Sequence, residues 1–79
     1  MHIAVCDDES FFRKTLSEEL YIYADKHGLN FIIYEYSDGM ELLAADMSFD
    51  LIFMDHQIFQ NPIFRIQIGI YVFLIHIVQ

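Results

Sequence analysis

The uninterrupted apolar run at residues 51–54, which leads directly into Asp55, constrains the fold of this chain more than any other stretch. A run of this length, bounded by polar residues, is typical of a strand that is buried on both faces of a sheet. Its last residue then emerges at the carboxyl edge of the sheet, where open α/β sheets keep their chemistry. The run therefore predicts that Asp55 lies at a functional edge.

A long amphipathic helix is expected after a first strand at residues 3–6. Ser10 is a suitable N-cap residue, and Gly28 suits the position that ends a helix. Apolar residues recur at helical spacing and predict the buried side. We expect Phe12, Leu16, Leu20 and Tyr23 on that side, with Arg13, Lys14, Ser17 and Glu18 facing solvent.

A second strand and a short helix are expected before the central run. The strand is predicted at residues 31–34 from its apolar, strand-favouring side chains. Asp38 and Glu41 are spaced as a capping pair for the helix that follows. The expected apolar side of this helix consists of Met40, Leu42, Leu43 and Met47.

The resulting order is strand, helix, strand, helix, strand, which predicts an α/β fold with parallel strands and helical crossovers. Crossovers are nearly always right-handed. If the helices cover opposite faces, the first strand lies between the other two, as in half of a doubly wound sheet. This topology brings Asp7 and Asp8, which follow the first strand, next to Asp55 at the end of the third.

Three neighbouring carboxylates repel one another, and a bound cation relieves that repulsion. All-oxygen ligation with retained waters suits Mg²⁺, so Asp7, Asp8 and Asp55 are predicted ligands, with the backbone carbonyl of Gln57 as a further one. An aspartate beside Mg²⁺ is a competent nucleophile toward a phosphoryl group. We therefore predict that Asp55 is a phosphoacceptor.

Acidic residues at strand ends also occur simply as loop or capping residues, and this alternative stays open. Asp8 or Glu9 would favour a helix N-terminus through the helix dipole alone. The four histidines show no metal-ligand spacing. Cys6, within the first strand, is expected to be a small core residue rather than a reactive thiol.

Charge divides the chain into two parts. The net charge is −8, and all twelve acidic residues precede His56, whereas Arg65 is the one charged residue after it. The acidic part disfavours direct nucleic-acid binding. We assign residues 1–57 to one domain and 58–79 to an atypical hydrophobic tail. The single cysteine and the absence of a signal-peptide pattern favour a cytoplasmic location.

The tail between residues 63 and 78 is rich in Ile, Val, Phe and Tyr, which favour strands. One expectation is that it adds one or two strands beside the third strand. The alternative is a membrane anchor, although the segment is short and includes Arg65, Gln67 and His76. Its low charge and high strand propensity also predict non-specific oligomers.

Residues 1–55 resemble the first half of a bacterial response-regulator receiver domain. The resemblance rests on Val5-Cys6-Asp7-Asp8-Glu9, on residues 36–43 and on residues 50–55. The opening run is most similar to receivers attached to LytTR-type DNA-binding domains. The resemblance implies a flavodoxin-like fold, phosphorylation of Asp55 by a sensor histidine kinase, and Mg²⁺ bound by Asp7 and Asp8. It implies a signalling module of a two-component phosphorelay rather than an enzyme.

The resemblance ends soon after Asp55. Receivers have a Met-Pro-Gly-like turn there, and later a Ser or Thr and a Lys that read out the phosphate, whereas this chain has no Ser after Ser48, no Thr after Thr15 and no Lys after Lys26. We therefore expect a truncated receiver with impaired switching. The alternative function is a small membrane-associated or sequestering protein anchored by its tail. A metal-dependent phosphohydrolase is a weaker hypothesis. Such enzymes usually have a second acid two residues after the nucleophile, and Gln57 stands at that position.

Overall fold

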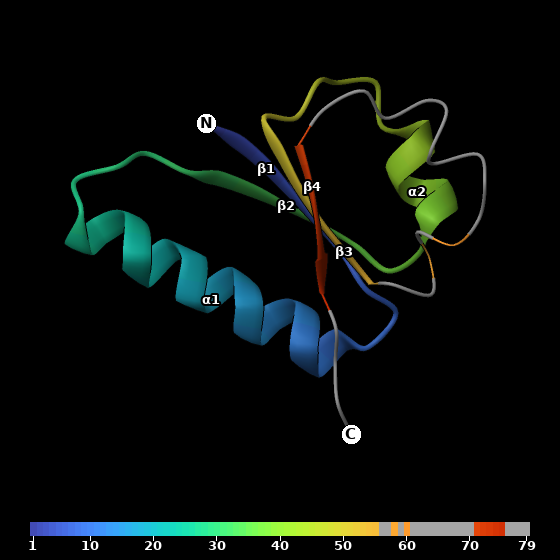
Figure 1. Cartoon of the computed structure of the whole chain (residues 1–79), viewed down its shortest axis with the longest axis horizontal. Coiled ribbons are helices and arrows are strands. Elements are labelled where there is room, and N and C mark those ends of the chain that lie inside the picture. Colours follow the sequence, from blue (N-terminus) through green and yellow to red (C-terminus); the bar gives the residue numbers. More distant parts are fainter. Residues whose placement is uncertain (56–57, 59, 61–70, 76–79) are drawn as a thin grey trace.

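The computed structural model describes residues 1–55, 58, 60 and 71–75. It has an α/β fold in which two helices flank a parallel sheet (Figure 1). The elements in chain order are β1 (His2–Cys6), α1 (Ser10–Lys26), β2 (Ile32–Tyr36), α2 (Gly39–Ala44), β3 (Leu51–Asp55) and β4 (Tyr71–Ile75). The strand predicted from the central apolar run is thus confirmed with its expected last residue.

The strands pair in the order β2-β1-β3-β4, and every pair is parallel. The first strand therefore lies between the second and third, as the alternating pattern predicted. Cys6 pairs with Met54, so the residues that follow β1 lie beside Asp55 at the end of β3. This register, rather than any local contact, brings the predicted site residues to one edge.

The two faces of the sheet are covered by different helices. Side chains alternate between faces along a strand, and one set packs with Leu42 of α2 into the principal core. That core consists of Ala4, Cys6, Leu42, Phe49, Ile52 and Met54, with Tyr34, Tyr36, Leu43, Ala45 and Ile58 packed against it. Ile3 and Val5 are fully buried as well and belong to the alternate set on the α1 side. Figure 1 shows α1 and α2 on opposite sides of the strands.

The buried side of helix α1 matches the hydrophobic pattern only in part: three of the four residues predicted on that side are half-buried. Ser17 and Ala24 are its buried residues, whereas Tyr23 is 53% exposed. Small side chains allow the helix to approach the strands closely, and the Ser17 hydroxyl is satisfied because it donates to the Arg13 carbonyl at 2.9 Å. The prediction that Ser17 and Arg13 face solvent is therefore wrong.

The ends of α1 match the sequence only in part. The capping position is Glu9, not the predicted Ser10, and its side chain makes no capping hydrogen bond. Ser10 is the first helical residue instead. At the other end, Gly28 adopts the left-handed conformation (φ 66°) just after the helix, as expected for a glycine there.

Helix α2 begins with the predicted cap. The Glu41 amide donates to Asp38 Oδ1 at 2.8 Å, and the Glu41 carboxylate accepts from the Ser37 hydroxyl at 2.6 Å. Leu42 is buried, but Met40 is 69% exposed and does not belong to the apolar side that we predicted. Met47 lies beyond the end of the helix, which is only six residues long.

The tail contributes β4, which pairs in parallel with β3 and confirms that the tail adds a strand beside it. Other predictions for the tail and for the turn after Asp55, including Gln57 and Arg65, concern residues outside the described part of the chain. Among the helices that the structure describes, none is long and apolar enough to cross a membrane.

Candidate metal centre

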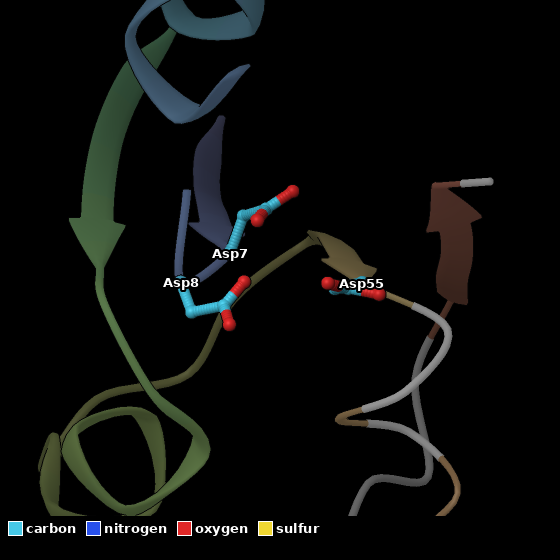
Figure 2. Close-up of side chains that lie close together, drawn as sticks. All are labelled: Asp7, Asp8 and Asp55. Carbon is cyan, nitrogen blue, oxygen red and sulfur yellow. The ribbon is translucent and has the colours of Figure 1, made fainter. Parts of the chain in front are cut away.

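Three carboxylates meet at the carboxyl edge of the sheet, as the topology predicted. Asp7 and Asp8 follow β1 directly, and Asp55 is the last residue of β3 (Figure 2). One oxygen from each side chain can be chosen so that all three lie within 4.8 Å of one another. Figure 2 shows the three side chains around one space, contributed by two strand ends that are distant in sequence.

Asp7 is the most constrained of the three. Its amide donates to the Tyr36 carbonyl at 3.1 Å, which ties the chain to the end of β2. Its Oδ1 atom accepts from the Glu9 amide at 2.9 Å, and this hydrogen bond stabilises the loop that leads into α1. The residue is 1% exposed although it carries a carboxylate. The backbone and side chain of Asp7 are thus held in place, and Asp7 itself is shielded from solvent.

The second oxygen of Asp7 is the most informative atom of the site. Within the described part of the chain, Oδ2 is buried and has no hydrogen-bond partner. A buried polar atom without a partner costs free energy, and native proteins contain few of them. Asp8 is exposed and Asp55 is half-buried, so the cluster opens toward solvent on one side. A cation that enters from that side would satisfy the buried oxygen.

The electrostatics of the site act on Asp7 first. Burial raises its pKa above the usual value of 3.8. The charge of Asp55, the hydrogen bond that a protonated Asp7 would make to the Asp8 side chain, and the charge of Asp8 raise this pKa further. The hydrogen bond from the Glu9 amide opposes this shift in pKa by stabilising the charged form. The ionised side chain is therefore destabilised where it stands, and a positive charge in the cluster would relieve it.

Cys6, directly before the acidic pair, is fully buried in the core, as predicted. Burial raises the pKa of its thiol to about 12, and the surrounding carboxylates, Asp38 and Asp7 first among them, contribute to the rise. The thiol is therefore neutral at physiological pH, and its role is packing.

Arg13 is the residue of the site that the sequence pattern assigned to the wrong surface. Its Nη1 donates to the Asp7 carbonyl at 2.7 Å, and its Nε lies 3.3 Å from Glu35 Oε1. A periodicity argument that scores arginine only as polar could not reveal this contact.

The donor set fits a small hard cation. Carboxylate oxygens are the ligands that Mg²⁺ prefers, usually with several retained waters, and the exposed side of Asp8 leaves room for them. The orphaned Oδ2 atom supplies the structural reason for a ligand at this place. Three clustered acids could therefore hold a metal ion. The fourth predicted ligand, Gln57, lies outside the described residues.

Comparison with known proteins provides no further assignment: no family model matches the chain, and no curated protein or solved structure matches it either. The function must therefore be inferred from the geometry of the site.

Proposed function

We propose that this chain is a receiver-type phosphoacceptor module with a flavodoxin-like half-sheet. In this proposal Asp7, Asp8 and Asp55 hold Mg²⁺, and Asp55 accepts a phosphoryl group from a sensor histidine kinase. The observation that carries the proposal is the convergence of the three carboxylates, one of which, Asp7, has a buried oxygen without a hydrogen-bond partner among the described residues. The resemblance of residues 1–55 to receiver sequences supports the same function.

The transfer requires little from the protein beyond placement and charge. A carboxylate oxygen of Asp55 forms a bond to phosphorus while the bond from phosphorus to the donor histidine nitrogen breaks. The nitrogen leaves with the electron pair of that bond, and Asp55 becomes an acyl phosphate. When bound, Mg²⁺ would offset the negative charge on the transferring oxygens.

In this proposal Asp7 and Asp55 have different roles, which their different surroundings support. Asp7 is buried and held at both its amide and its Oδ1 atom, which suits a fixed ligand. Asp55 ends a central strand and is half-buried, so it remains accessible to a donor from outside.

The test is phosphorylation by a small acyl phosphate. Incubation with acetyl phosphate and Mg²⁺, followed by intact-mass analysis, should show one added phosphoryl group, because the donor replaces the kinase and releases acetate. The adduct should be cleaved by hydroxylamine, which attacks acyl phosphates but not phosphoserine. Chelation of Mg²⁺ with EDTA should prevent its formation.

Asp55→Asn should abolish the adduct, since an amide oxygen is a poor nucleophile. Asp50→Asn is the matched control, because Asp50 lies directly before the same strand at its opposite end and should be phosphorylated like the wild type. An adduct that persists in Asp55→Asn, or the absence of an adduct in the folded wild-type protein, would refute the proposed function.

A further inference from the structure

We infer that Arg13 is a positioning residue for the carboxylate cluster, because its guanidinium holds the peptide bond between Asp7 and Asp8 in one orientation. The inference rests on the proposed function and names a residue that orients the ligands of the proposed metal site. It concerns affinity for the cation and not the phosphoryl transfer itself.

The contact is made to the backbone rather than to a carboxylate. Arg13 Nη1 donates to the carbonyl oxygen of Asp7 at 2.7 Å. That oxygen belongs to the peptide unit that connects Asp7 to Asp8, and a peptide unit is planar. Fixing the oxygen therefore restricts rotation of the plane, and the plane, together with the φ angle of Asp8, sets the direction in which the exposed Asp8 side chain leaves the backbone.

The guanidinium is itself held in place. Its Nε lies 3.3 Å from Glu35 Oε1 on β2, and the Arg13 side chain is only 15% exposed. The Arg13 backbone belongs to the first turn of α1, where its amide donates to the Glu9 carbonyl at 3.0 Å. One planar group thus connects the loop after β1 to both α1 and β2. A lysine ammonium, which lacks this fork of donors, could not make the two contacts in the same way.

Two roles for Arg13 predict opposite changes in Mg²⁺ affinity. If the residue acted through its positive charge alone, its removal would make the cluster more negative and would strengthen cation binding. If it orients the Asp7–Asp8 peptide, its removal would allow that peptide to rotate and would weaken binding. The sign of the change therefore separates the two roles.

The experiment is a calorimetric titration of Mg²⁺ into the wild-type protein, Arg13→Met and Lys14→Met. Lys14 is the matched control, because it is the exposed neighbour of Arg13 on the same helix and its replacement removes the same charge. We expect Arg13→Met to weaken Mg²⁺ binding about tenfold, at the low end of the effect of residues that orient metal ligands. Lys14→Met should bind within about twofold of the wild type, a change small on the same scale.

Arg13→Lys keeps the charge and provides a second, independent test, which decides the matter if Arg13→Met does not fold. It should also bind Mg²⁺ more weakly than the wild type, since charge alone does not orient the peptide. The Asp8 amide resonance should differ from that of the wild type before Mg²⁺ is added. A purely structural role would lower the free energy of unfolding and leave the Mg²⁺ affinity unchanged.

Unchanged or tighter Mg²⁺ binding in the folded Arg13 variants, beside normal binding by the wild type, would overturn this inference and leave the proposed function intact. If the folded wild-type protein does not bind Mg²⁺, the proposed metal site is wrong, and the inference fails with it.

Discussion

Acidic residues at the two ends of the sheet differ in their burial and in their hydrogen-bond partners. At the amino end, Asp50 is exposed and makes two hydrogen bonds to His2. Its Oδ2 accepts from the His2 amide at 2.7 Å, and its own amide donates to the His2 carbonyl at 2.7 Å. At the carboxyl end, Asp7 is buried, and its Oδ2 has no hydrogen-bond partner among the described residues. Both acids flank strands of one sheet, yet the Asp50 Oδ2 atom has a partner and the Asp7 Oδ2 atom has none among the described residues.

This contrast shows that a strand-end acid is not a functional signal by itself. Asp50 connects the starts of β1 and β3 and is explained by its two hydrogen bonds. Asp7 has a buried oxygen for which the described part of the chain supplies no partner. Such an oxygen costs stability and therefore requires another explanation. A ligand that binds the folded state would supply that explanation, because its binding free energy adds to stability.

The largest effect on Mg²⁺ affinity is expected when Asp7, at the carboxyl end of the sheet, is replaced. Asp7→Asn should weaken Mg²⁺ binding by more than about 100-fold, beyond the range found for residues that only orient ligands. In EDTA the same variant should raise the free energy of unfolding by about 1 kcal/mol, since a desolvated charge is removed. Calorimetric titration and urea unfolding measure the two quantities.

The asparagine side chain of this variant would retain an oxygen for the hydrogen bond from the Glu9 amide, so the loop geometry should survive the change. If Asp7→Asn were less stable than the wild type in EDTA and bound Mg²⁺ equally well, Asp7 would have the structural role that we assign to Asp50.

A smaller and purely structural effect is expected at the amino end. Asp50→Ala removes the acceptor for the His2 amide and should lower the free energy of unfolding by about 1 kcal/mol, as for an ordinary hydrogen bond. Mg²⁺ affinity should not change, because Asp50 lies at the far end of β3. Urea unfolding and Mg²⁺ titration of the variant measure both effects.

Asp46→Ala serves as the control, since it removes an exposed acid from the same connection between α2 and β3. A weaker Mg²⁺ affinity in Asp50→Ala, without a similar change in the control, would contradict the division between the two ends.

The sequence predicted the features that depend on local pattern or on topology. The buried strand at Leu51–Asp55 was recognisable because a strand covered on both faces needs consecutive apolar residues. The Asp38 cap was recognisable because its hydrogen bond spans only three residues. The meeting of Asp7 with Asp55 followed from strand order alone, which the sheet confirms.

The features that escaped prediction depend on packing between elements. Ser17 is buried because α1 turns its small residues toward the strands, a choice that the apolar pattern of the helix does not specify. Arg13 faces the site for the same reason, and its acceptor is a backbone carbonyl that no side-chain pattern encodes. The unpartnered Asp7 oxygen depends on a side-chain rotamer and on what surrounds it, so it became visible only in three dimensions.

The smallest expected effect is the pH dependence of the free energy of unfolding that Asp7 causes. Because the pKa of Asp7 is raised in the folded protein, the folded state holds this proton more tightly than the unfolded chain does. Its contribution to stability is therefore fully present below the unfolded pKa of about 3.8 and is lost as the pH rises through the higher folded value. Asp7→Asn cannot lose this contribution.

In EDTA, Asp7→Asn should therefore have a higher free energy of unfolding than the wild type near neutral pH. This difference should fall to near zero at low pH. Urea unfolding of both proteins across this range measures the difference, in which the titration of the other carboxylates largely cancels. Saturating Mg²⁺ should reverse the trend for the wild type, because the cation binds the deprotonated carboxylate. An advantage that stayed constant or shrank with rising pH would mean that burial does not disfavour the charge on Asp7.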